Sequence, residues 1–205
     1  MNRLKFIIYI FALCFSGYAS AVGAINRIVI LGDSISDGYG VATEAAYPFL
    51  LEKKLRDFKK RDIKVISSSV SGSTTASGPG RIKWIMKLKP ELILIALGGN
   101  DGLRGISVAE SQTNLEKTIE EIEKVKVKVI LVGMKMPPNY GAQYAKEFYQ
   151  TFEAVSRKKG IPLVPFLLER VGGEKSMNQT DGIHPNEPGH KIIAETLFDF
   201  LKDKL

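Results

Sequence analysis

The sequence predicts an α/β protein in which one parallel sheet lies between two layers of helices. Short apolar runs alternate with segments of helical periodicity five times along the chain, and this alternation is typical of parallel strands joined by helices. The third apolar run, residues 92–97, contains no polar side chain, which indicates a strand buried on both faces. Right-handed crossovers then place helices on both sides, so we expect a three-layer α/β/α sandwich with five strands.

The apolar runs give the strands in order. The first contains four consecutive apolar residues, 28–31, and ends at Gly32. The later runs are equally short and are bounded by turn residues. Strands are therefore expected at residues 25–31, 63–66, 92–97, 127–132 and 161–164.

Helical spacing and stop signals give the intervening elements. Tyr47, Leu51 and Leu55 recur at helical spacing, Pro90 stops the second helix, and Gly160 follows the fourth as a typical C-terminal glycine. Helices are expected at residues 44–60, 81–89, 107–124, 143–159 and 186–202. Polar or glycine-rich loops are expected at 67–80, 98–105 and 137–141, with a long connection at 166–184.

The N-terminus has the pattern of a secretory signal peptide. Arg3 and Lys5 precede ten consecutive apolar residues, and Ala19-Ser20-Ala21 then offers small residues at a cleavage site. We expect a signal peptide at residues 1–21, cleaved after Ala21 or, alternatively, after Ala24. This predicts a periplasmic or secreted protein whose single domain covers residues 25–205. The only cysteine, Cys14, would leave with the signal peptide.

Composition excludes several classes of protein. The 205 residues are 44% hydrophobic and 25% charged, which is ordinary for one globular domain. The formal net charge is +7, or +5 once Arg3 and Lys5 leave with the predicted signal peptide; this is a mild surplus, and no nucleic-acid recognition motif accompanies it. We therefore expect no nucleic-acid partner, although transient contact with a lipid or membrane surface fits the charge. A monomer is expected, because the predicted core is complete.

Three of the predicted loops bring polar groups to one edge of the sheet. Ser34 follows the first strand, Gly72 the second and Asn100 the third. In open α/β sheets, ligands bind beyond the carboxyl ends of the strands. A fourth loop, just before the last helix, carries Asp181 and His184. Each residue also has a structural explanation, such as a helix cap, a turn or a surface pair, but together they favour a catalytic site.

The chemistry of these residues is that of nucleophilic catalysis. A serine hydroxyl needs a base, and histidine, with an unperturbed pKa near 6.5, is the usual one. Of the two histidines, His184 is favoured because Asp181 can orient its ring, whereas His190 is expected on the surface of the last helix. The backbone N–H groups of Ser34 and Gly72 and the amide of Asn100 could stabilise an oxyanion.

The same residues resemble the motifs of the SGNH hydrolases, also called the GDSL esterase/lipase family. The segment GDSIS at 32–36 resembles the family's first block, SSSVSG at 67–72 the block that carries its glycine, GGND at 98–101 its third and DGIHP at 181–185 its last. Ile35 stands where the family often has leucine, a conservative change. The stretch GNDGLRG at 99–105 and the stretch PPNYG at 137–141 are most similar to the bacterial exported arylesterases and multifunctional thioesterase I/lysophospholipases.

This resemblance implies a flavodoxin-like sheet with strand order 2-1-3-4-5. It also implies Ser34 as nucleophile, His184 as base, Asp181 as its orienter, and an oxyanion hole formed by Ser34, Gly72 and Asn100. The expected activity is hydrolysis of small-molecule carboxylic esters or thioesters through an acyl-enzyme, without a cofactor or metal. The acyl group is expected to lie against apolar loop residues, for which the candidates are Leu103, Ile106, Met136 and Tyr140.

Two alternatives stay open at this point. A carbohydrate O-deacetylase would use the same catalytic set, but the chain has no tryptophan cluster, since Trp84 is alone. A non-catalytic, flavodoxin-like binding module would hold a phosphate at the loop after the first strand. The sequence offers no G-x-x-x-x-G-K-[ST] or post-strand G-x-G-x-x-G motif for nucleotides. The nucleophile is not in a G-x-S-x-G elbow, and two histidines cannot build a usual zinc site.

Overall fold

The computed structural model describes residues 24–205. The predicted signal peptide at residues 1–21, including Cys14, lies outside the described residues. Within the described part, five parallel strands form one sheet with the order β2-β1-β3-β4-β5, and this confirms both the predicted fold class and the predicted strand order. The strands are β1 (Arg27–Gly32), β2 (Lys64–Ser69), β3 (Leu92–Ala96), β4 (Lys128–Val132) and β5 (Leu163–Val164).

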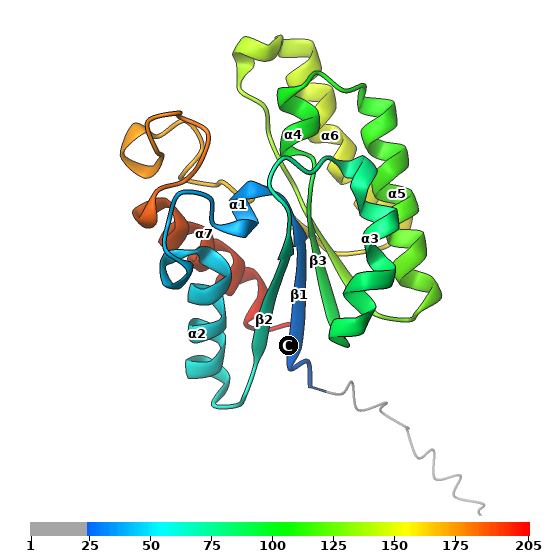
Figure 1. Ribbon diagram of the computed structural model, residues 1–205. Coiled ribbons are helices and arrows are strands. Elements are labelled where there is room, and N and C mark those ends of the chain that lie inside the picture. Colours follow the sequence, from blue (N-terminus) through cyan, green and yellow to red (C-terminus); the bar gives the residue numbers. More distant parts are fainter. Residues whose placement is uncertain (1–23) are drawn as a thin grey trace, which may run out of the picture.

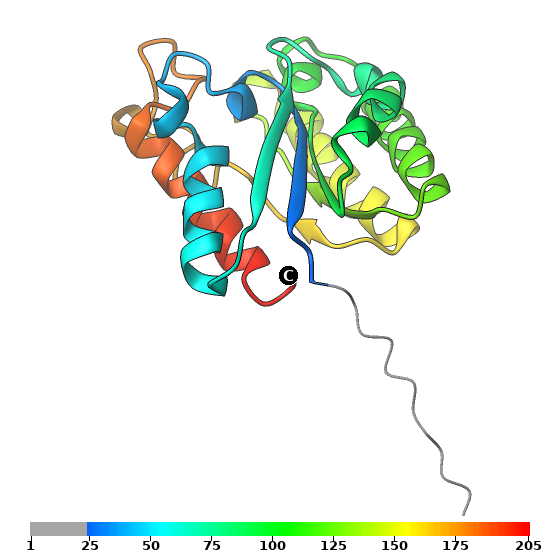
Figure 2. The same cartoon turned by 60° about the horizontal axis from the view of Figure 1, so that its bottom comes forward.

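Helices cover both faces of the sheet, as Figures 1 and 2 show. On one face α2 (Tyr47–Lys59) packs against α7 (Glu187–Leu201). On the other, α5 (Val108–Lys124) lies between α3 (Gly78–Ile85) and α6 (Ala142–Lys159). Short elements complete the chain: helices α1 (Ser34–Asp37) and α4 (Gly99–Leu103), and 3₁₀ turns η1 (Thr43–Ala45), η2 (Thr75–Ser77), η3 (Met86–Leu88), η4 (Pro138–Tyr140) and η5 (Lys175–Met177).

The core lies on both faces of the central strands. Residues 28–31 of β1 are completely buried, and every residue of β3 is buried. Burying one such aliphatic side chain contributes roughly 1.5–3 kcal/mol to the free energy of unfolding. The sheet is therefore a rigid platform for the loops that follow its carboxyl ends.

Some element boundaries differ from the sequence prediction. The predicted loop at 67–80 is wrong at both ends: β2 continues to Ser69, which pairs with Gly32 of β1, and α3 already begins at Gly78 with a proline in its first turn. The high Ser/Thr content favours a loop, but strand pairing extends β2 and the proline in the first turn of α3 favours an earlier helix start. The helix predicted from residue 44 begins at Tyr47, next to Pro48, and residues 43–45 form a separate 3₁₀ turn.

The largest correction concerns residues 98–105, which were expected to be a glycine-rich loop. Residues Gly99–Leu103 instead form helix α4. The physical reason is tertiary: Asp101 is completely buried and its carboxylate accepts the backbone N–H of Thr75 at 2.9 Å and the hydroxyl of Ser111 at 3.2 Å. These bonds fix α4 against its neighbours despite the low helix propensity of glycine. Similarly, the predicted loop at 137–141 contains the 3₁₀ turn η4.

Candidate active site

Ser34 lies where β1 gives way to helix α1. Asp33 caps this helix, because its Oδ1 accepts the backbone N–H of Ile35 at 3.1 Å. Gly32 permits the close turn, since a Cβ at this position would lie 2.3 Å from the hydroxyl of Ser36. Strand, cap and short helix therefore fix the Ser34 side chain at the carboxyl edge of the sheet.

Ser34, His184 and Asp181 form a continuous chain of hydrogen bonds. His184 Nε2 lies 2.9 Å from Ser34 Oγ, and its Nδ1 lies 2.7 Å from Asp181 Oδ2. The other oxygen of Asp181 accepts the backbone N–H groups of Ile183 and His184 at 2.9 and 3.0 Å. These two backbone donors and the His184 ring, led by the His184 N–H, lower the pKa of Asp181 from 3.8 to about 2. The carboxylate is thus ionised at neutral pH and faces the imidazole.

The three predicted oxyanion donors follow β1, β2 and β3 at the same edge of the parallel sheet. Gly72 lies in a turn with φ of +78°, and the Asn100 amide donates to the carbonyl of Ser73 at 3.0 Å. Gly99 lies against Asp33, because a Cβ on Gly99 would be 3.3 Å from the Asp33 carboxylate. The Asn100 amide has a second hydrogen, and within residues 24–205 neither Ser34 N–H nor Gly72 N–H donates to a protein acceptor. Such donors can stabilise an anionic oxygen.

Asp33 is a buried carboxyl group that sequence reasoning assigned to no role. Its side chain is only 2% exposed, and burial raises its pKa from 3.8 to about 6. The N–H of Ile35 and the charge of His184 act in the opposite direction. Its cap of α1 is a structural function that the position just before Ser34 could have indicated.

The prediction that His190 lies on the surface is wrong, because its side chain is completely buried. Its Nδ1 accepts the backbone N–H of Tyr47 at 3.2 Å, and its ring stacks on the Tyr47 ring. The Tyr47 hydroxyl in turn lies 2.6 Å from that of Ser36. Burial lowers the pKa of His190 from 6.5 to about 4. The opening turn of α7 faces α2 rather than solvent, and the packing of these two helices is a tertiary feature.

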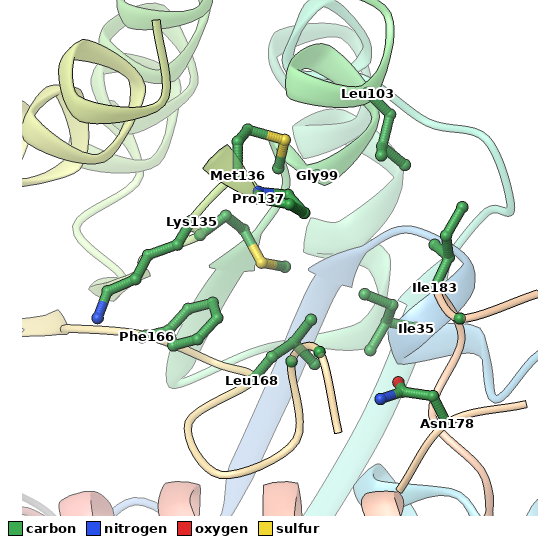
Figure 3. Close-up of a pocket in the computed structure, with 14 residues that line it drawn as sticks. Ile35, Gly99, Leu103, Lys135, Met136, Pro137, Phe166, Leu168, Asn178 and Ile183 are labelled. Atoms are coloured by element: carbon green, nitrogen blue, oxygen red, sulfur yellow. The ribbon is translucent and has the colours of Figure 1, made fainter. Parts of the chain in front are cut away.

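An apolar pocket of about 330 Å³ is lined in part by Ile35 and Ile183, which are the chain neighbours of Ser34 and His184. Figure 3 shows Leu103, Met136 and Phe166 around the same cavity. Two of the four predicted acyl-binding candidates, Leu103 and Met136, therefore line the pocket. Other apolar lining residues that the sequence reasoning missed are Met134, Pro137, Phe166, Leu168 and Ile183.

The other two candidates, Ile106 and Tyr140, do not line this pocket. The carbonyl of Ile106 instead accepts the Tyr144 hydroxyl at 2.8 Å, and Tyr140 is 39% exposed. Lys135 is also a lining residue, but its ammonium group lies 4.8 Å from the ring centre of Phe166 and 3.9 Å from the Glu169 carboxylate.

Among residues 24–205, no group of three or more His, Cys, Asp or Glu side chains is arranged to hold a metal ion. In the same range, the helices include none that is both long and apolar enough to cross a bilayer.

A serine, a histidine and a carboxylate in hydrogen-bond contact at the carboxyl edge of a parallel sheet are the arrangement of a serine hydrolase. Comparison with known families supports this class: residues 30–192 match the GDSL-like Lipase/Acylhydrolase family, and the chain belongs to that family. It is accordingly a carboxylic ester hydrolase, which confirms the predicted family and argues against a non-catalytic binding module.

Individual relatives agree with this assignment. Esterase TesA of Pseudomonas aeruginosa is 38% identical over 200 residues, covering 95% of this chain and 99% of that protein. Thioesterase 1/protease 1/lysophospholipase L1 of Escherichia coli is 33% identical over 173 residues, covering 84% and 81%. The structure of psychrotrophic esterase EstA from Pseudoalteromonas, inhibited by monoethylphosphonate, has a TM-score of 0.81 and 34% identity, covering 87% and 97%.

Proposed function

We propose that this protein hydrolyses carboxylic esters and thioesters through an acyl-enzyme on Ser34. One observation carries the proposal, the hydrogen-bond chain from Asp181 Oδ2 through the His184 ring to Ser34 Oγ, with distances of 2.7 and 2.9 Å. Both distances are short enough for proton transfer and ring orientation.

In the first half of the reaction, Ser34 Oγ attacks the acyl carbonyl and His184 Nε2 accepts the hydroxyl proton. Asp181 holds the ring and stabilises the imidazolium that forms. The carbonyl oxygen becomes negative and accepts hydrogen bonds from Ser34 N–H, Gly72 N–H and the Asn100 amide. His184 then gives its proton to the leaving alcohol or thiol. In the second half, His184 activates a water molecule, which releases the carboxylic acid from Ser34.

The pocket supports an apolar acyl group. Its lining by Ile35, Leu103 and Met136 offers hydrocarbon surface, and Ile35 directly follows Ser34 in the chain. An apolar acyl chain gains free energy from burial there, whereas a sugar would lose hydration against a lining whose polar side chains are those of Lys135 and Asn178. This favours medium-chain acyl esters and thioesters over a carbohydrate O-deacetylase function.

Hydrolysis of p-nitrophenyl esters from acetyl to palmitoyl, beside the Ser34→Ala variant, tests the proposal. We expect the highest kcat/KM on medium chains, no turnover by Ser34→Ala, and no effect of a chelator. Ser156→Ala is the matched control, because Ser156 lies near the end of α6 and donates only to the Ile161 carbonyl. Turnover by Ser34→Ala would overturn the assignment of the nucleophile, and activity confined to acetate would favour the deacetylase. An acyl thioester assayed in parallel measures the relative preference for the two bonds.

We further propose that the protein is exported, on the strength of the N-terminal sequence pattern alone. The mature chain would then begin at Val22 or Ile25, and intact-mass measurement of the protein from the expressing cell tests this. A mature chain that still begins at Met1 would overturn the proposal.

A further inference from the structure

The loop that carries Gly72 makes a tight turn beside the nucleophile. We call residues 70–73 the Gly72 loop. Val70 N–H donates to the carbonyl of Gly32 at 3.2 Å, and Ser73 N–H donates back to the carbonyl of Val70 at 3.1 Å. Gly72 itself has a φ of +78°. Because glycine has no side chain to restrict its two peptide planes, an anchor outside the turn is needed to keep the Gly72 N–H in one direction.

Arg81 holds the Gly72 loop against the carboxyl ends of β1 and β2. Its guanidinium group, carried by α3, is partly buried and donates to the hydroxyl of Ser73 at 3.3 Å and to the carbonyl of Gly32 at 3.2 Å. It also donates to the carbonyl of Ser68. One side chain thus joins the ends of β1 and β2 to the Gly72 loop. Burial lowers the pKa of Arg81, while the nearby Asp33 carboxylate raises it.

Arg104 holds the Gly72 loop from the end of helix α4. Its Nη2 donates to the carbonyl oxygen of Gly72 at 3.0 Å. Arg104 is the C-cap of α4, and its backbone N–H donates to the carbonyl of Asn100 at 3.1 Å. The Asn100 amide donates to the next carbonyl of the loop, that of Ser73. Gly72 and Asn100 are the two proposed oxyanion residues that lie outside α1. They are therefore connected to each other through Arg104.

We propose that Arg81 and Arg104 are positioning residues that hold the Gly72 loop so that Gly72 N–H and the Asn100 amide point at one substrate oxygen. The inference rests on the proposed function, since it requires Ser34 as the attacking group. Hydrogen bonds from a charged guanidinium are stronger than neutral ones, and the planar fork of Arg81 reaches several acceptors at once. Oxyanion donors act only when they are fixed before the reaction begins.

The expected kinetic signature is a loss of kcat without a matching rise of KM, because a displaced donor weakens only the transition state. Deleting a whole oxyanion donor lowers kcat about 10²- to 10³-fold, so we expect displacement in Arg104→Ala to lower it about tenfold to a hundredfold. Arg104→Lys should recover part of the lost kcat, because Arg104 donates one hydrogen bond to the Gly72 carbonyl and an ammonium group can donate one as well. Added guanidinium at millimolar concentration should restore part of the kcat of Arg104→Ala, whereas sodium chloride at equal ionic strength should not.

The experiment uses purified protein, p-nitrophenyl butyrate for kcat and KM, and an alkyl p-nitrophenyl phosphonate as a second probe. In the phosphonate reaction a bond forms between Ser34 Oγ and phosphorus, His184 takes the hydroxyl proton, and p-nitrophenolate leaves with its electron pair. The amplitude of p-nitrophenolate release counts the active sites. The rate of this release reports how well the oxyanion donors are placed. We expect this rate to fall in parallel with kcat in Arg81→Ala and Arg104→Ala.

Arg56→Ala is the control, because Arg56 lies on α2 and, within residues 24–205, its guanidinium pairs with the surface carboxylates of Glu52 and Asp62. It should react like the wild type. Melting temperatures check folding, and if Arg81→Ala does not fold, the exposed Arg104 still gives the test. A wild-type protein that does not react with the phosphonate would contradict the proposed function. A wild type that reacts, with kcat and phosphonylation rate unchanged in Arg104→Ala, would overturn only the role of the two arginines.

Discussion

Asp181 binds His184 twice, through the ring and through the backbone. One carboxylate oxygen lies 2.7 Å from the ring nitrogen Nδ1, and the other accepts the His184 backbone N–H at 3.0 Å. A four-residue turn, residues 181–184, therefore fixes both the position and the rotation of the imidazole that faces Ser34.

Asp181→Asn should remove the orienting charge while it keeps the size of the side chain. We expect kcat to fall by at least about a hundredfold and up to about 10⁴-fold, since an amide favours the wrong imidazole tautomer. Because the pKa of Asp181 is about 2, the wild-type carboxylate stays ionised over the whole assay range. The kcat on a p-nitrophenyl ester measures the effect, with Asp57→Asn on α2 as control. A kcat within a few-fold of the wild type would contradict the orienting role.

His190 should make the protein less stable as the pH falls. Its pKa is about 4 in the folded protein and 6.5 in the unfolded chain, so between these values only the unfolded chain is protonated. The contribution to the free energy of unfolding therefore rises with pH from about 4 to 6.5, by about 3 kcal/mol in all. His190→Asn keeps an acceptor for the Tyr47 N–H. Its free energy of unfolding, measured with urea, should no longer show this rise with pH. An unchanged slope in the variant would contradict the assignment.

Asp33 should act in the opposite direction over nearly the same pH range. Its pKa is about 6 in the folded protein and 3.8 when unfolded, so between these values only the folded protein is protonated. The free energy of unfolding then falls by about 3 kcal/mol as the pH rises from about 4 to 6. Asp33→Asn keeps the cap of α1 and should be at least as stable as the wild type at pH 7.

These two groups together give a sharper expectation. The free energy of unfolding of the wild type should be nearly constant from pH 4.5 to 6. Over the same range Asp33→Asn should become more stable as the pH rises, and His190→Asn less stable. Urea midpoints of the three proteins across this range measure the slopes. If the free energy of unfolding changed with pH in the same direction in both variants, the opposed contributions of Asp33 and His190 would be refuted.

Gly102→Ala should change substrate selection with little effect on folding. A Cβ at Gly102 would lie 2.2 Å from the Met136 sulfur, so this flexible side chain must move within the pocket. Alanine is itself favourable in a helix by about 1 kcal/mol. We expect an altered profile of kcat/KM against acyl chain length. Gly80→Ala is the matched control, because nothing lies within 4 Å of its added Cβ, and an unchanged profile in Gly102→Ala would argue against Met136 as an acyl contact.

Local sequence patterns were enough to predict the class of fold and most residues of the candidate site. Apolar runs alternating with helical periodicity are local signals, and they led to the five strands and to the edge where Ser34, Gly72 and Asn100 emerge. The short segments around Ser34 and His184 carried the family resemblance, because the chemistry requires those residue types at those positions.

Which side chains contact one another could be read only from the folded chain. The bond between Ser34 and His184 spans 150 residues of chain, and no local pattern encodes its length. Burial of Asp101 turned a glycine-rich stretch into helix α4, and packing of α7 on α2 buried His190. The pocket draws on the long connection before His184, where Phe166 and Leu168 acquire their role from the way the chain folds back. Propensity and periodicity describe neighbours along the chain, whereas pocket walls, buried charges and arginine anchors depend on neighbours in space.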